Sequence, residues 1–127
     1  MPLSPALSAD QAAAPAAPNL NLFWVRCSHD PVSGHGVSGV YVICRTGARG
    51  RECLVVGETR DIATELARTI RESHIAGYAA SGELDIAWAA VASLHRPGIA
   101  GYLGATLSPT LAGPASVARQ IPVNLPS

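Results

Sequence analysis

The chain has 127 residues, which is enough for one domain and too few for two. Apolar residues make up 48 % and charged residues 14 %, a balance that favours a packed core and excludes disorder for most of the chain. The nine basic residues are all arginine, and nine acidic residues bring the formal net charge to zero. A neutral chain has no overall attraction for polyanions, so any binding of nucleic acid must come from local clusters of arginine.

Residues 1–21 are rich in alanine, proline and serine. Side chains this small bury too little surface to offset the entropy lost on ordering, so we predict a flexible arm followed by a single domain over residues 22–127. Prolines interrupt the alanines and no basic stretch precedes them, so we expect no signal peptide. No apolar run is long enough to span a bilayer, and we therefore expect a cytoplasmic protein with no membrane partner.

Strand signals dominate the first half of the domain. A short apolar run at residues 22–25 predicts an edge strand or a plug over the core, and a polar loop follows at residues 28–38. β-Branched and aromatic side chains predict strands at residues 39–44 and 53–57. Residues 45–51 hold two glycines and no large apolar side chain, so they are expected to form a hairpin loop between antiparallel strands.

A helix is expected directly after the second strand. An N-cap oxygen is available from Thr59 or Asp61, and Gly77 is a typical stop. Apolar side chains recur every four residues and form one stripe, at Ile62, Leu66 and Ile70.

The second half of the domain adds one more strand and one more helix. Residues 84–91 predict a strand covered on both faces, because both alternating sets of positions are apolar from Ile86 onward. Pro97 suits the first turn of a helix that Pro109 ends. Residues 121–126 contain two prolines, so they are expected to form a C-terminal strap across the surface. The order β-β-α-β-α predicts an α/β (α+β) domain with a small, mainly antiparallel central sheet flanked by helices.

Two short motifs lie on either side of the expected hairpin loop. Gly39-Val-Tyr41 opens the first strand, and Val55-Val-Gly57 ends the second strand directly before the helix. This arrangement resembles the GIY-YIG nuclease domain, in which two short strands carry G-[IV]-Y and Y-[IV]-G and a helix follows. The resemblance covers about residues 38–112 and implies a GIY-YIG-like fold.

Members of that family cut phosphodiesters with one divalent metal ion. The resemblance implies a first tyrosine that, helped by a second, takes the proton of the attacking water, and an arginine on the first helix that neutralises the phosphate. It also implies a glutamate on the second helix that holds the metal, and an asparagine that completes the pocket. This chain keeps the first tyrosine as Tyr41. The other four family positions fall, in that order, on Val55, Glu65, Ala100 and Ala112.

These replacements predict a vestigial site at Tyr41. Ala100 offers no oxygen to a magnesium ion, Val55 cannot relay a proton, and Glu65 places a negative charge where a phosphate must be stabilised. We expect the pocket beside the hairpin to be short of oxygen ligands and of positive charge, with no metal and no cofactor. The resulting hypothesis is a non-catalytic GIY-YIG-like domain that serves as a binding or assembly module.

A second hypothesis is an active, metal-dependent DNA endonuclease with relocated catalytic residues. Shifting the alignment of the helix by three residues puts Arg68 at the phosphate position. Glu83 or Asp85 would then hold Mg²⁺, which requires them to lie close to Tyr41 in the fold.

Nucleic acid or another protein is the expected partner. Arginine forks match phosphate geometry, and the arginines expected beside the cleft are Arg60, Arg68, Arg71 and Arg45. A third hypothesis is an unrelated protein-interaction domain that uses Trp24, Trp88 and the apolar strap of residues 115–127.

Cys44 and Cys53 fall on the two neighbouring predicted strands and are expected to face each other. They are either two reduced core thiols or a redox pair. The four histidines lack the spacing of a zinc site. His29 and His35, in the loop before the first motif, are either solvated or part of a ligand site.

Overall fold

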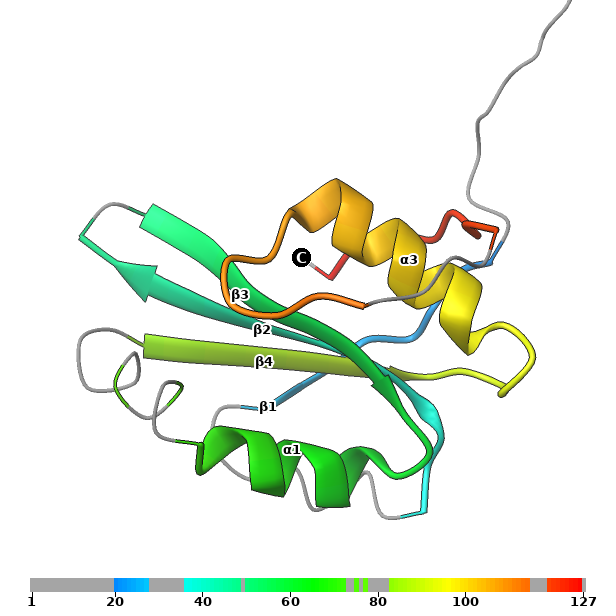
Figure 1. The fold of residues 1–127 in the computed structure, drawn as a ribbon, viewed down its shortest axis with the longest axis horizontal. Helices are drawn as coiled ribbons and strands as arrows, with labels where there is room; N and C mark the ends of the chain where they lie inside the picture. Colours follow the sequence, from blue (N-terminus) through cyan, green and yellow to red (C-terminus); the bar gives the residue numbers. More distant parts are fainter. Residues whose placement is uncertain are drawn as a thin grey trace, which may run out of the picture.

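The computed structural model describes residues 20–27, 36–48, 50–72, 75, 77, 83–114 and 119–126. In these ranges the order of elements is β1 (Val25–Cys27), β2 (Gly39–Gly47), β3 (Gly50–Thr59), α1 (Ile62–Ile70), β4 (Glu83–Ala90) and α3 (Arg96–Leu107), as drawn in Figure 1. The α+β class is therefore confirmed. Most of the predicted arm, residues 1–19, lies outside the described residues, as do His29, His35 and residues 115–118 of the strap.

The four strands form one sheet in the order β1-β4-β2-β3, and every neighbouring pair is antiparallel. In this register Tyr41 on the central strand β2 lies opposite Gly57 on β3 and opposite Trp88 on β4. Because side chains alternate between the two faces of a strand, these positions share one face. None of the described helices is long and apolar enough to cross a membrane.

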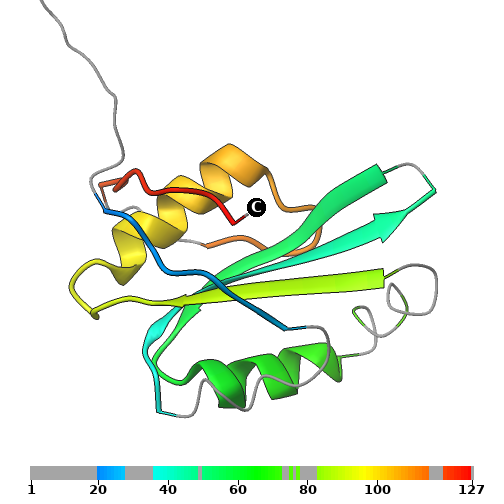
Figure 2. The ribbon, with the colours of Figure 1, turned by 180° about the vertical axis from the view of Figure 1, so that it is seen from behind.

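The two helices cover opposite faces of the sheet, with α1 against one face and α3 against the other (Figures 1 and 2). Burial on both faces explains why β4 is apolar at every position from Ile86 to Ala89, as the sequence predicts. The buried side chains on the α1 face are Tyr41, Ile43, Leu54, Val55, Ile62, Leu66, Ile75, Ile86 and Trp88. Those on the α3 face are Val40, Val42, Cys44, Val56, Ala89, Val91, Ile99, Ala100, Leu103 and Val123.

The cap of α1 follows the sequence closely, but the end of the helix does not. Asp61 is the N-cap, and its side chain accepts a hydrogen bond from the Thr64 backbone N–H at 3.3 Å. The prediction that the helix continues to Gly77 is wrong for α1, which ends at Ile70. The N–H groups of Arg71 and Glu72 turn back to carbonyls three residues earlier, and this tighter turn closes the helix.

The hairpin between β2 and β3 is longer, and its loop shorter, than predicted. The ladder continues through Arg45–Glu52 and Thr46–Arg51 to Gly47–Gly50, whereas the sequence predicts a loop over residues 45–51. Gly50 has a φ of 101°, a conformation that suits glycine in a tight hairpin turn. The polar side chains at this end pair across strands instead of filling a core, so they carry no apolar strand signal.

The two ends of the described chain are joined to each other. Asn124 accepts a hydrogen bond from the Leu22 N–H at 2.5 Å and donates one to the Leu22 carbonyl at 2.9 Å. Figure 2 shows the N-terminal segment (blue) and the C-terminal segment (red) side by side near α3. Val123 is 3 % exposed within the core on the α3 face, so the described part of the strap packs on the domain.

A second extended segment follows α3 and lies along the outer side of β3. The N–H of Thr110 bonds to the Cys53 carbonyl at 3.0 Å, and the N–H of Leu111 bonds to the Leu54 carbonyl at 2.8 Å. The Val56 N–H completes the contact by bonding to the Ala112 carbonyl at 3.0 Å. The segment therefore pairs its backbone with a strand while leaving the four-stranded sheet unchanged.

Candidate functional site

Both motif glycines are required by close approaches in the fold. A Cβ atom on Gly57 would overlap the ring and hydroxyl of Tyr41, which lies across the strand pair. A Cβ atom on Gly39 would overlap the Ala89 carbonyl of β4. Glycine leaves space for these neighbours because it has no side chain. The two glycines thus allow the phenol to lie flat over β3 and the three strands to pack at this point.

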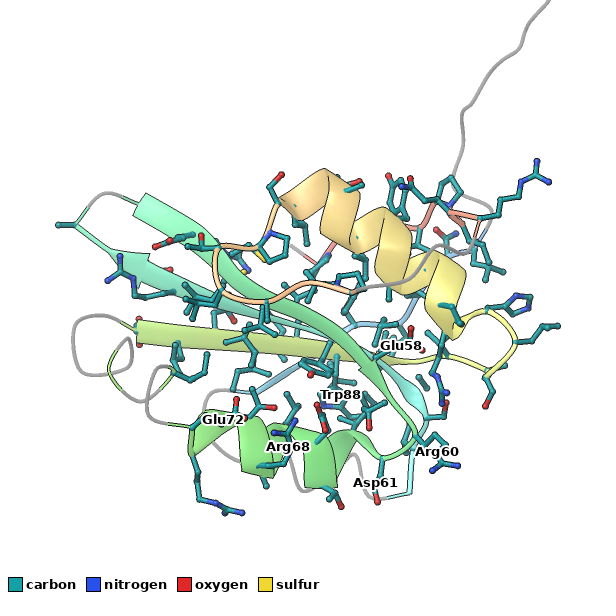
Figure 3. All side chains as sticks on the ribbon, in the orientation of Figure 1. Glu58, Arg60, Asp61, Arg68, Glu72 and Trp88 are labelled. Atoms are coloured by element: carbon teal, nitrogen blue, oxygen red, sulfur yellow. The ribbon has the colours of Figure 1, made fainter. Side chains whose placement is uncertain are left out.

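The Tyr41 hydroxyl points toward α1 and donates a hydrogen bond to Glu65 Oε2 at 2.9 Å. The same carboxylate oxygen accepts a bond from Arg68 Nη2 at 2.8 Å, and Arg68 Nη1 reaches Glu72 Oε2 at 2.8 Å. Figure 3 shows Arg68 on α1 and Glu72 just past its end, beneath the sheet. The expectation of a pocket short of oxygen ligands and of positive charge is therefore wrong, because Glu65 and Arg68, one turn apart on α1, bring a carboxylate and a guanidinium to the phenol.

The surroundings of Tyr41 make its hydroxyl a very weak acid. The side chain is 5 % exposed, and burial is the main cause that raises its pKa well above the usual value of 10. The neighbouring Glu65 carboxylate raises the pKa further, both through its charge and through the hydrogen bond. Thr69 and Arg68 lower the pKa, but by less than burial and Glu65 raise it. The phenol stays protonated at neutral pH and acts as a hydrogen-bond donor.

Val55 and Ala112, the positions expected for the second tyrosine and the asparagine, lie next to each other. Val55 and Ala112 form an isolated parallel bridge, and Val55 is 5 % exposed in the core on the α1 face. Neither side chain carries a group that binds a metal or moves a proton. This corner is therefore a packing contact between β3 and the segment after α3.

Ala100 lies far from the phenol because it belongs to the other face of the sheet. It is fully buried on α3 among side chains of the α3 face, whereas Tyr41 belongs to the α1 face. The sequence position expected for the metal ligand therefore does not meet the tyrosine. Among the described residues there is no group of three or more metal-ligating side chains.

The acidic residues of β4 also stay away from Tyr41. Asp85 pairs with Cys44 on β2, three positions along from Tyr41, so about 10 Å of strand separates the two backbones. Its side chain alternates to the α3 face, where Arg26 and Arg51 bind it at 2.7 and 2.8 Å. Glu83 is two residues farther along β4. The relocated metal site would require at least one of these carboxylates near the phenol, and the register separates both from it.

The four arginines predicted for nucleic-acid contact do not form one patch. Arg68 is paired with Glu65 and Glu72, and Arg45 is paired with Glu52 across the hairpin at 3.2 Å. Arg60 precedes α1 and Arg71 follows it, about 16 Å apart along the helix axis (Figure 3 labels Arg60 and Arg68). Both are exposed. Ion pairing and spacing therefore leave only single exposed guanidinium groups at the two ends of α1.

The tryptophans are held inside the domain. Trp88 is 6 % exposed beside Tyr41, and its Nε1 has no hydrogen-bond partner among the described residues. Trp24 packs partly buried on the α3 face, and its Nε1 donates to the Asn124 carbonyl at 2.9 Å. These side chains contribute to packing, whereas Phe23 and Leu94, each 84 % exposed, lie on the surface.

The sequence does not predict the polar contacts that Arg96 makes. Arg96, at the start of α3, donates to Ser38 Oγ at 2.8 Å and to the Thr59 carbonyl at 3.4 Å, and it pairs with Glu58 at 3.4 Å. The contact ties the first turn of α3 to the start of β2 and the end of β3. Arg96 lies 37 to 58 residues after these partners in the sequence, so no local sequence pattern predicts the contact.

Cys44 and Cys53 face each other across β2 and β3, as predicted. Comparison of the chain with family models, with curated proteins and with solved structures gives no match.

Proposed function

We propose that this chain is a non-catalytic GIY-YIG-like domain that serves as a binding or assembly module. The observation that carries the proposal is the hydrogen bond from the buried Tyr41 hydroxyl to Glu65. A tyrosine that activates water must accept a proton, and a hydroxyl that donates to a carboxylate in a buried setting does not.

The charge around the phenol also opposes phosphodiester chemistry. Among the described residues, Glu65 and Glu72 supply two carboxylates, and the Arg68 guanidinium binds both. A phosphate about 4 Å from Glu65 would be repelled by about 4 kcal/mol at an effective dielectric constant of about 20. Arg68 is already engaged by two carboxylates and compensates this repulsion only in part. Repulsion of the phosphate would therefore reduce the binding energy that is available to stabilise a transition state.

The positions of the motif residues support the proposed relationship to the GIY-YIG family. Tyr41 of the first motif lies opposite Gly57 of the second, and α1 begins soon after Gly57 behind the Asp61 cap. Glu65, which aligns with the family arginine, is the residue that contacts Tyr41. A chance match of two short motifs would give no reason for these positions to converge.

A plasmid nicking assay tests the absence of catalysis. Supercoiled DNA is incubated with Mg²⁺ or Mn²⁺ and the full chain, the Tyr41→Phe variant or the matched control Tyr102→Phe, in which the changed tyrosine lies on α3. We expect the three proteins to leave the plasmid supercoiled to the same extent. Metal-dependent nicking that Tyr41→Phe abolishes and Tyr102→Phe retains would overturn the proposal in favour of an active nuclease.

Two further experiments test whether the domain binds a partner or assembles with itself. Fluorescence anisotropy with labelled duplex and single-stranded DNA tests nucleic acid as the partner, and light scattering over a range of concentrations tests self-assembly. Nucleic-acid binding through Arg60 and Arg71 would weaken as salt is raised and would be reduced in the Arg60→Gln, Arg71→Gln double variant. Plasmid cleavage without stable binding or assembly would contradict the module proposal.

A further inference from the structure

A β-bulge brings the thiols of Cys44 and Cys53 to the same face of the sheet. Ile43 opposes Val55, but the next residue, Cys44, opposes Cys53, so Leu54 is an extra residue on β3. Leu54 and Val55 both pack in the core on the α1 face, while Cys53 returns to the α3 face. In a regular ladder Leu54 would oppose Cys44, and Cys53 would point away from it. The bulge therefore creates the dithiol.

Contacts from outside the sheet hold this bulge in place. The Leu54 carbonyl accepts bonds from the N–H groups of Leu111 at 2.8 Å and Ala112 at 3.2 Å. The Cys53 carbonyl accepts one from the Thr110 N–H at 3.0 Å. Backbone groups that the bulge frees from the ladder are thus satisfied by the segment after α3. The position of Cys53 is fixed by structure and is independent of any bond between the sulfurs.

The two sulfurs are placed where a disulfide can form. Directly opposite residues of an antiparallel pair have Cα atoms about 4.5–5.5 Å apart, within the range that disulfides span. Both cysteines are free in the structure. Cys44 is 6 % exposed, while Cys53 is half-buried and closer to solvent.

A pocket of about 260 Å³ opens beside the pair. Its walls are mostly apolar, with Val42 from β2, Leu107 from the end of α3 and Leu125 from the strap. Arg51 is the charged side chain among its lining residues. A pocket that combines two thiols, apolar walls and one guanidinium suits a small sulfur compound that carries a carboxylate.

The charges facing the thiols favour one thiolate. The pKa of Cys44 is lowered to about 7, first by the hydrogen bond from Cys53 and then by Arg51, while burial and Asp85 oppose the shift. The pKa of Cys53 is raised, because it keeps the proton that the pair shares. Arg26 and Arg51 both bind the Asp85 carboxylate on the same face of the sheet as the sulfurs. The pocket walls from α3 and the strap are uncharged.

We infer that Cys44 and Cys53 form a reactive dithiol site that takes small, carboxylate-bearing disulfides and closes to a reversible cross-strand disulfide. This inference goes beyond the proposed binding function and does not depend on it, because the dithiol lies on the α3 face and Tyr41 lies on the α1 face.

The reaction is two successive thiol–disulfide exchanges. The Cys44 thiolate attacks one sulfur of the disulfide RSSR, which forms a Cys44–SR mixed disulfide and releases RS⁻. The Cys53 sulfur then attacks Cys44, its proton passes to the departing sulfur, and RSH leaves as the Cys44–Cys53 bond forms. The protein pair is oxidised by two electrons, and RSSR is reduced to its two thiol halves. A small dithiol in excess reverses both steps.

The experiment uses the full chain with Cys27→Ser, so that the pair supplies every reacting thiol. It is treated with 3,3′-dithiodipropionate, an anionic disulfide, or with cystamine, a cationic disulfide of similar length. Intact mass and peptide mapping after acid quenching follow the products. We expect loss of two hydrogens without a retained adduct, a rate that rises with a midpoint near pH 7, and severalfold faster reaction with the anionic reagent.

Matched variants separate this site from ordinary thiol reactivity. Cys53→Ser should stop at a stable mixed disulfide on Cys44, and Arg51→Gln should move the pH midpoint upward and reduce the preference for the anionic reagent. Arg45→Gln, which removes an arginine next to Cys44 in sequence that pairs with Glu52, should leave both unchanged. A persistent adduct in the parent protein, or rates equal to those of the urea-unfolded chain with no charge preference, would overturn the inference.

Discussion

The phenol of Tyr41 and the carboxylate of Glu65 meet between β2 and α1, with 2.9 Å between their oxygen atoms. The two positions are the ones where the GIY-YIG resemblance expects a tyrosine and an arginine. Under the proposed relationship to that family, glutamate at the arginine position gives a hydrogen bond that joins the helix to the sheet in place of a group that would attract phosphate. The contact therefore has a structural effect that can be measured independently of any activity.

Tyr41→Phe should lower the free energy of unfolding by about 1 kcal/mol, because it removes one buried hydrogen bond and keeps the ring. Urea denaturation followed by circular dichroism measures the change. Tyr102→Phe on α3 is the matched control and is expected to change stability by less than about 0.5 kcal/mol. Equal stability of the wild type and Tyr41→Phe would show that the bond contributes nothing to the fold.

Gly57→Ala should destabilise the domain by about 1–3 kcal/mol, because the added methyl group overlaps the Tyr41 ring and forces it to move. The clash disappears when the ring is removed, so the costs of Gly57→Ala and Tyr41→Leu should not add in the double variant. A double-mutant cycle of urea midpoints measures this coupling. Strict additivity would contradict the close approach of the two residues.

Ala100→Glu restores the residue type that the family resemblance expects for metal binding, and it should unfold or strongly destabilise the domain. The new carboxylate would enter an apolar core at a fully buried position, at a cost above about 3 kcal/mol. Ala105→Glu, on an exposed position of the same helix, should cost far less. Thermal melting with and without Mg²⁺ compares the two. Magnesium-dependent stabilisation of Ala100→Glu would contradict the placement of Ala100.

The stability of the reduced protein should rise with pH between 7 and 9. The pKa of Cys44 is about 7 in the folded chain and 9.0 for an ordinary cysteine, so in this window the unfolded chain binds the extra proton. The contribution is lost as the pH falls through 7. Above pH 9 the raised pKa of Cys53 works in the opposite direction. Urea midpoints measured in reductant should show the rise in the wild type and a smaller one in Cys44→Ser.

Local patterns predicted the elements whose side chains enter the core. A run that is apolar at both alternating sets of positions marked the strand around Trp88, because burial on two faces selects apolar residues. Pro97 and Pro109 marked the two ends of the second helix. The outer end of the hairpin was missed, since its pairs Arg45–Glu52 and Thr46–Arg51 are polar and resemble a loop in composition.

The candidate site was predicted less well than the fold. Motif spacing identified Tyr41 and Glu65 as related positions, but it did not predict that they bond to each other through α1. The ladder shift at Leu54 also left no mark in the sequence, because it depends on hydrogen bonds to Leu111 and Ala112, more than 50 residues away. Contacts between distant segments decide such details, and single-sequence patterns carry no information about them.

The pairing of residues 110–112 with β3 has a consequence for encounters between copies of the domain. Unpaired backbone at a sheet margin is a template for strand addition and amyloid-like aggregation. The groups of β3 at Cys53, Leu54 and Val56 are already occupied, so a foreign strand finds no template there. At the opposite margin of the described sheet, β1 offers only three residues. Neither edge of the described sheet therefore favours strand addition or fibril growth.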